Sequence, residues 1–204
     1  TWVTEPAYTA WWQMDSKLSA PKNSNLKTVM DFSFFDKINI AKTEQTETWF
    51  KGLDRVYNNF VYDFLYPNPA SVLAFIENHD TDRFLGEGDN LPMLKQASTL
   101  LLTTRRIPQL YYGTEIMMNG VKSKSDGYVR KDFPGGWTGD TETALTAAGR
   151  SKIQNECYNF YKTLLNWRKG NDVIAKGSMV QFMVQNGVYA YARQHEGKTV
   201  FVML

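Results

Sequence analysis

The sequence predicts a mixed α/β fold, in which a parallel sheet covered by helices is followed by a short antiparallel β domain. Over the first 170 residues, short apolar runs alternate with long amphipathic segments. Strand–helix alternation of this kind predicts a parallel sheet. After Gly170 the pattern changes to short strands joined by tight turns, which predicts an antiparallel arrangement. We therefore expect one domain over residues 1–170 and the beginning of a second over residues 171–204.

The predicted elements of the first domain follow from hydrophobic spacing. Strand candidates are short, nearly continuous apolar runs, as expected for strands covered on both faces. They span residues 26–32, 71–76 and 107–112. Helix candidates carry apolar residues at three-four spacing. They span residues 46–65, about 92–106 and 149–169. A long loop rich in Gly, Lys and Asp is expected over residues 119–146.

The second domain is predicted from turn residues. Residues 179–185 and 188–193 flank Asn186-Gly187, a pair typical of a two-residue hairpin turn. The run 196–198 turns the chain again into a last strand over residues 199–204. That strand has no turn or polar tail after it, and the chain begins at Thr1 without a methionine. We therefore expect the chain to be a piece of a longer polypeptide.

Composition excludes several classes of function. The net charge is +2 and the basic residues are scattered, which argues against nucleic-acid binding. Cys157 is the one cysteine, so an intrachain disulfide and a cysteine-based zinc site are excluded. The two histidines, His79 and His195, offer little material for a metal cluster. No apolar stretch approaches the roughly 20 residues that a membrane-spanning helix needs.

The strongest candidate site comes directly after the buried run 72–76. Six polar or ionisable residues occur between Glu77 and Asp82, at a point where a strand leaves the interior. In an extended strand Asn78 and Asp80 share one face. Three interpretations stay open on composition alone: a solvated loop with a helix cap, a metal site at His79, Asp80 and Asp82, or a catalytic site.

The run Phe75-Ile-Glu-Asn-His-Asp80 resembles the fourth conserved motif of the α-amylase superfamily, glycoside hydrolase family 13. In that family the motif closes the seventh strand of a (β/α)8 barrel, also called a TIM barrel. The resemblance implies that Asp80 is the third catalytic carboxylate and that His79 contacts the sugar at the cleavage site. It also places Asn78 at the substrate-binding site, where Asn78 holds the turn or, as the alternative, contacts the substrate directly.

Further matches occur in the family's order along the whole chain. Residues 107–115 resemble the eighth strand and the turn after it, and the hairpins after residue 170 resemble the start of a C-terminal β-sandwich. Residues 130–137 resemble the loop of the neopullulanase and cyclomaltodextrinase branch, so Arg130 and Trp137 are expected to border the substrate cleft. Thr1-Trp2 resembles the residues after the fifth strand. The implied fold is the C-terminal half of the barrel followed by the start of the β-sandwich.

The implied activity is retaining hydrolysis of α-glucosidic bonds in maltooligosaccharides, cyclodextrins or pullulan, as in starch degradation, without a metal or an organic cofactor. Retaining glycosidases need a nucleophilic carboxylate and an acid. The family's positions for both lie outside residues 1–204, and Glu5, Asp31 and Glu77 match neither motif. The chain alone is therefore expected to be inactive. The alternative is a non-catalytic amylase-like barrel used for glucan binding or assembly, and a metal-dependent hydrolase is a third hypothesis.

Three further expectations concern neighbours and location. Glu115 and Arg83 are candidates for an internal ion pair or for substrate contacts, and Tyr111 and Tyr112 either line the cleft or pack beneath the loop. The open sheet edges predict a homo-oligomer or association with the missing half. Analogy with starch-uptake systems suggests a periplasmic location, with the cytoplasm as the alternative.

Overall fold

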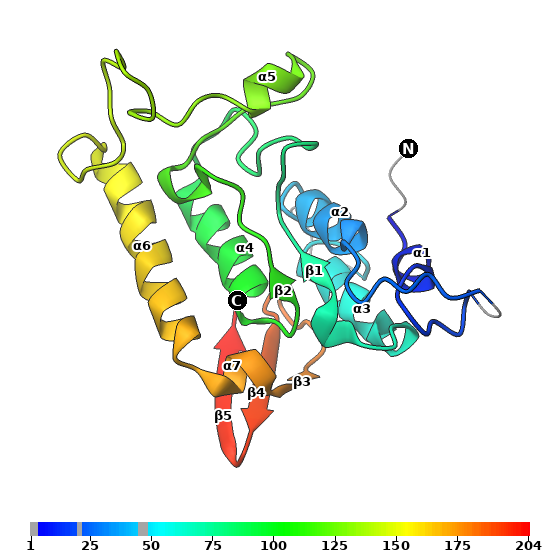
Figure 1. Cartoon of the computed structure of the whole chain (residues 1–204). Coiled ribbons are helices and arrows are strands. Elements are labelled where there is room, and N and C mark those ends of the chain that lie inside the picture. The colour runs from blue at the N-terminus through cyan, green and yellow to red at the C-terminus, as the bar shows by residue number, and fades with distance from the viewer. Residues whose placement is uncertain (1–3, 20–21, 45–48) are drawn as a thin grey trace.

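A short parallel sheet in the first half of the molecule sets the position of the candidate site. The computed structural model describes residues 4–19, 22–44 and 49–204. Strand β1 (Leu73–Ala74) pairs in parallel with strand β2 (Ile107–Pro108). On its other edge, β1 forms a parallel bridge from Leu73 to Met30. Three extended segments thus lie side by side, which confirms the predicted parallel pairing (Figure 1).

Both strands are shorter than the predicted runs 71–76 and 107–112. The ladder ends after Ala74 because the next main-chain groups have side-chain partners. The Nδ2 atom of Asn39 donates to the Ile76 carbonyl at 2.9 Å. The Asn78 amide donates to the Thr81 hydroxyl at 2.9 Å. The chain therefore turns away from the sheet within a few residues of β1.

The prediction of a strand over residues 26–32 was largely wrong. Only the bridge at Met30 remains of it, because helix α2 (Phe32–Ala41) begins at once. The Asp31 carboxylate accepts a hydrogen bond from the Phe34 amide at 2.9 Å and so caps this helix. Phe34 and Ile38, one turn apart on α2, are both buried. Burial at a spacing of four residues is typical of one face of a helix.

The three predicted helices are present with shifted starts. They are α3 (Leu53–Val61), α4 (Leu91–Thr103) and α6 (Lys152–Lys169). Helix α3 cannot extend further back, because Phe50 and Gly52 have positive φ angles of 63° and 55°. The predicted start of that helix at residues 46–48 lies outside the described residues. Helix α6 begins at a capping box formed by Ser151 and Gln154.

Several short helices lie in segments where no separate helix was predicted. They are α1 (Pro6–Trp11), η1 (Tyr62–Leu65), η2 (Pro69–Ser71), η3 (Thr114–Ile116), α5 (Asp126–Val129) and α7 (Asp172–Lys176). Most of them are a turn or two long, too short for a periodic hydrophobic pattern to reveal them. Helix α5 lies within the predicted loop 119–146, at the top of the molecule in Figure 1.

The predicted antiparallel region is confirmed. Strands β3 (Ser178–Gln181), β4 (Ala190–His195) and β5 (Lys198–Met203) form one antiparallel sheet in that order. Asn186 and Gly187 connect β3 to β4 with φ angles of 51° and 74°. Two consecutive positive φ angles are the signature of a type I′ hairpin turn.

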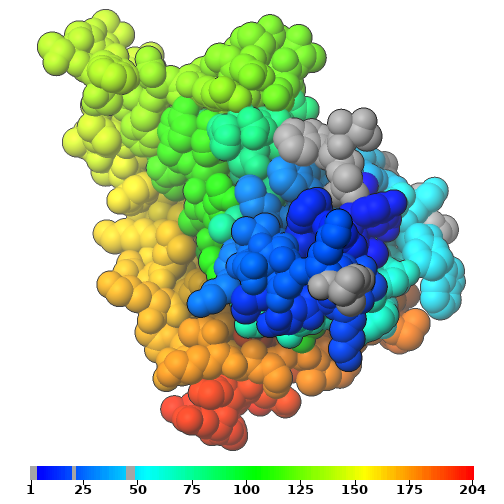
Figure 2. All heavy atoms as spheres, turned by 45° about the vertical axis from the view of Figure 1, so that its right-hand side comes forward, coloured from blue at the N-terminus to red at the C-terminus, as the bar shows by residue number. Residues whose placement is uncertain are grey.

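One hydrophobic cluster joins the two regions. It includes Phe34 and Phe60 from the helices, Ile76 after β1, and Tyr191 and Val202 from the antiparallel sheet. Figure 2 shows the segment around α5 and the loop before α6 at one end of the molecule, and the β4–β5 turn at the other. The structure is thus a mixed α/β arrangement that ends in a small antiparallel sheet.

Candidate functional site

The loop after β1 holds Asp80 at the surface. Asn78 is buried, and its Oδ1 atom accepts a hydrogen bond from the Asp80 amide at 2.8 Å. With the bond from the Asn78 amide to Thr81, this forms a tight polar turn. The side chain of Asp80 is 39% exposed and that of His79 is 58% exposed. The turn therefore presents both side chains to solvent, where a ligand can reach them.

Arg130 completes this group from 50 residues further along the chain. Its Nη2 atom lies 3.2 Å from Oδ1 of Asp80, and its Nε atom donates to the His79 carbonyl at 2.9 Å. The same Nη2 atom lies 3.2 Å from Oδ2 of Asp126. The other oxygen of Asp80 lies 3.3 Å from Nε2 of His79. Each oxygen of the Asp80 carboxylate thus faces a nitrogen-bearing side chain.

Trp137 is separate from this group. Its side chain is 66% exposed, and it lies in the loop between α5 and α6, at the upper left of Figure 1. Its amide donates to the Asp140 carboxylate at 3.1 Å, within the same loop. Hydrogen bonds and close polar contacts thus bring together Asn78, His79, Asp80 and Arg130, whereas the hydrogen bond of Trp137 goes to Asp140.

A buried ion pair lies next to this group. Glu77 and Arg83 are almost fully buried, and Nη1 of Arg83 lies 3.3 Å from Oε1 of Glu77. Thr114 and the Phe84 amide also donate to the Glu77 carboxylate. Burial raises the pKa of Glu77 above its ordinary value. Arg83 thus pairs with Glu77, whereas the sequence had suggested Glu115.

The two tyrosines after β2 pack on this ion pair. The guanidinium of Arg83 lies 3.9 Å from the ring centre of Tyr111 and 4.8 Å from that of Tyr112. The Tyr112 hydroxyl donates to the Lys131 carbonyl at 2.6 Å. Burial, with a hydrogen bond to Tyr112, raises the pKa of Tyr111 to about 12. Both rings therefore support the loop from beneath, although Tyr112 is still partly exposed.

Other carboxylates near the sheet have structural partners. Asp31 is buried beside Arg106, with 3.0 Å between Oδ2 and Nη1. Glu5 is exposed and faces Lys37 at 3.4 Å. Thr81 and Glu77 belong to the framework of the site, although the sequence did not single them out for that role. The only sequence signal for this role was their position in the chain, Glu77 beside Asn78 and Thr81 beside Asp80.

Neither a metal cluster nor a membrane-spanning helix is present in the described part of the chain. Within residues 4–19, 22–44 and 49–204, no three His, Cys, Asp or Glu side chains are grouped so that they could hold a metal ion. None of the helices in those ranges is long and apolar enough to cross a membrane.

A pocket of about 410 Å³ has no lining contribution from Asp80. It opens to solvent between α2, α3 and α4 and is lined by Ile38, Lys42, Phe84 and Leu100, among others. None of Asn78, His79, Asp80 or Arg130 lines it. The exposed polar groups that could act on a substrate are at the loop after β1, so we place the candidate site there.

Comparison with known proteins gives a consistent set of relatives. Residues 179–204 match the family model of the cyclomaltodextrinase C-terminal domain. A cyclomaltodextrin glucanotransferase of Thermoanaerobacterium thermosulfurigenes is 32% identical over 89% of this chain, and an α-amylase of Niallia circulans is 30% identical over 89%. The chain spans 22% and 30% of the length of these two proteins.

The fold has the same relatives. The structure of an α-amylase from Geobacillus thermoleovorans complexed with acarbose superimposes with a TM-score of 0.71 at 21% identity. The alignment covers 100% of this chain and 40% of that one. Fold and sequence together define a relative of enzymes that act on α-glucans. The chain belongs to the α-amylase superfamily, glycoside hydrolase family 13.

Proposed function

We propose that this chain contributes Asp80 to a site that hydrolyses α-glucosidic bonds with retention of configuration. The substrates proposed are maltooligosaccharides, cyclodextrins or pullulan. The observation that carries the proposal is the half-exposed carboxylate of Asp80, on the loop after a strand of a parallel sheet. In sheets of this kind, catalytic groups lie at the carboxyl ends of the strands. The glucanotransferase and amylase relatives support the substrate class.

The proposed role of Asp80 is to stabilise charge. A glycosidic bond breaks through a transition state with positive charge on the sugar ring. A nearby carboxylate opposes that charge and accepts hydrogen bonds from ring hydroxyls, which strengthen as the charge develops. His79 and Arg130 lie on either side of Asp80 and supply donors for the same sugar. In this proposal, the nucleophilic carboxylate and the general acid come from a part of the parent protein outside residues 1–204.

The proposed fold of the parent protein is consistent with this role. Three parallel segments at Met30, β1 and β2 are each followed by a helix, as in half of a (β/α)8 barrel. We therefore propose residues 1–170 as the second half of the barrel and residues 171–204 as the start of a β domain. The family-model match over residues 179–204, to a cyclomaltodextrinase C-terminal domain, supports a relation to cyclomaltodextrinases.

Substitution of Asp80 tests the role. In a polypeptide that joins this chain to the predicted nucleophile and acid, Asp80→Asn should lower turnover by about 10²- to 10³-fold. Substrate binding should change little, because the amide keeps the shape of the side chain. Turnover and KM on maltoheptaose provide the measurement. Asp82→Asn is the matched control, because Asp82 accepts a bond from the Lys122 amide and should tolerate the change better. Near-normal turnover in Asp80→Asn would exclude the role.

A non-catalytic glucan-binding function is the second candidate. It is favoured by one observation, that the Asp80 carboxylate is in close contact with the side chains of His79 and Arg130. Calorimetric titration with acarbose separates the two. Binding by the joined polypeptide without any hydrolysis of maltoheptaose would select the second candidate.

A further inference from the structure

We propose that Arg83, held by Glu77, is the residue that positions His79, Asp80 and Arg130 relative to one another. This inference rests on the proposed function, since it concerns the geometry of the same site. Arg83 does not contact a substrate in this proposal. It acts through the main chain on either side of the Asp80 loop.

The first contact closes the Asp80 loop on itself. The pair between Arg83 and Glu77 joins two residues that flank the whole turn, from Asn78 to Asp82. The Phe84 amide also donates to Glu77, so the ends of the turn are held together twice. Both members of the pair are at most 2% exposed. Water therefore does not compete for these bonds as it does at the surface.

The second contact joins that loop to the segment that carries Arg130. Nε of Arg83 donates to the Val129 carbonyl at 3.1 Å, and the Arg83 amide donates to the Gly120 carbonyl at 3.0 Å. Arg130, the residue after Val129, then contacts the His79 carbonyl and the Asp80 carboxylate. The path from Glu77 through Arg83 and Arg130 back to Asp80 is thus a closed ring of contacts.

The third contact joins Arg83 to the segment after β2. Nη1 of Arg83 donates to the Tyr112 carbonyl at 2.6 Å, while its planar group lies 3.9 Å from the Tyr111 ring centre. One guanidinium thus bonds to three separate stretches of chain. A lysine has a single ammonium and no planar face, so it cannot reproduce this fork and stacking. The site geometry should therefore require arginine at this position.

The experiment uses nuclear magnetic resonance on the 204-residue chain itself. Its two histidines give two sets of imidazole signals, from His79 and His195. In Arg83→Lys, the His79 ring signals and the Asp80 amide signal should shift, and those of His195 should not. Glu77→Gln should shift the same signals. It is the second test of the proposal if Arg83→Lys does not fold.

Arg193→Lys is the matched control. Arg193 is also buried and also bonds main-chain carbonyls, those of Ser178, Thr103, Ile174 and Gly177, but it lies in β4. Arg193→Lys should lower the Tm without shifting the His79 and Asp80 signals.

The proposal is overturned if Arg83→Lys and Glu77→Gln lower the Tm, as Arg193→Lys does, without moving the His79 and Asp80 signals. In that case Arg83 only stabilises the core. The result does not depend on hydrolysis, so it is distinguishable from failure of the proposed function.

Discussion

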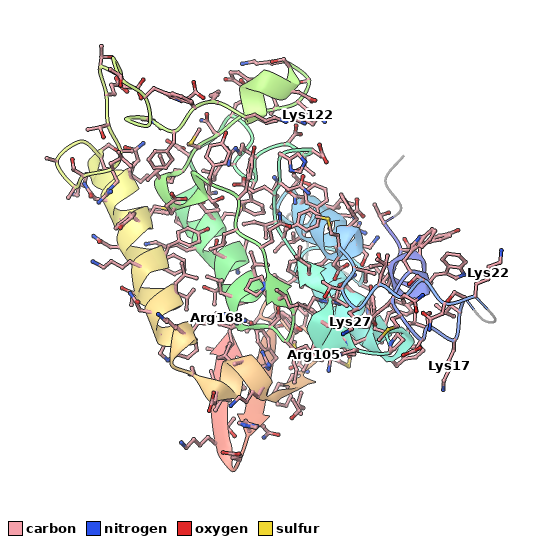
Figure 3. The ribbon with its side chains drawn as sticks, viewed as in Figure 1. Lys17, Lys22, Lys27, Arg105, Lys122 and Arg168 are labelled. Carbon is pink, nitrogen blue, oxygen red and sulfur yellow. The ribbon has the colours of Figure 1, made fainter. Side chains whose placement is uncertain are left out.

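Buried charges link the sheet to its helices at the residue scale. Arg106 is fully buried, with 3.0 Å between its Nη1 atom and the Asp31 carboxylate and 2.7 Å between its Nη2 atom and the Asp63 carboxylate. Asp31 caps α2 and Asp63 lies in η1, so one side chain connects two elements to the start of β2. Arg105 also pairs with Asp63. Figure 3 shows Arg105 in the lower half of the molecule and Lys122 near its top.

Replacing Arg106 should therefore be costly. Arg106→Met should lower the free energy of unfolding by about 3–5 kcal/mol, because it leaves two buried carboxylates without their common partner. Urea denaturation followed by circular dichroism measures this change. Lys95→Met is the control, since the pair between Lys95 and Glu156 is solvent-exposed and should contribute little. Equal stability of the two variants would contradict the importance of the buried network.

The sequence predicted the site residues best where they are adjacent in the chain. Asn78, His79 and Asp80 are adjacent in the chain, and the structure places them in one polar turn. The contact of Arg130 with Asp80 joins residues 50 apart, and a position near the site was expected for Arg130 only through the family resemblance. The roles of Glu77 and Arg83 could not be predicted, because burial of a charged pair depends on which segments pack around it.

At the scale of elements, contacts between residues close in the chain determined where most turns, helices and strands begin and end. The Asn186-Gly187 turn was predicted correctly because both residues tolerate positive φ. Helix α2 was missed because residues 26–32 look like a strand, and the capping role of Asp31 was not recognised. The parallel strands were overestimated in length, since side chains such as Asn39 bind the main chain where a neighbouring strand would.

The hairpin turn gives a prediction at this scale. Gly187→Ala should lower the free energy of unfolding by about 1–2 kcal/mol, because alanine is strained at a φ of 74° even though its Cβ would meet no atom within 4 Å. Thermal unfolding provides the measurement. Gly170→Ala is the control, because Gly170 has a φ of −96° and equally open surroundings. A larger loss of Tm in Gly170→Ala would refute the explanation.

At the scale of the whole molecule, one face of the antiparallel sheet is uncovered. Val180, Phe182, Phe201 and Met203 are exposed, with Phe201 at 59% and Met203 at 67%. Val180 and Phe201 both pair with Ala192, so they lie on the same face. The opposite face bears Tyr191 and Val202, which are buried in the core. Apolar faces of this kind in soluble proteins mark contact surfaces.

This face should cause the chain to associate. We expect the 204-residue chain to sediment as a mixture of monomer and larger species at micromolar concentrations. Phe201→Lys should shift the mixture toward monomer, because a charge on the apolar face opposes its burial. Analytical ultracentrifugation measures both. As a control, Phe64→Lys changes an aromatic residue that is also exposed but belongs to η1 and not to this sheet. A monodisperse monomer before any substitution would contradict the prediction.

The sequence by itself determined the alternation of strands and helices, the hairpin turn and the identity of the polar turn at Asp80. These features depend on residues close together in the chain, whose spacing and backbone preferences act locally. The tertiary structure alone decided that Arg83 pairs with Glu77 and that Arg106 joins Asp31 to Asp63. Such pairings join distant segments, and the cost of burying a charge selects partners only once those segments have packed together.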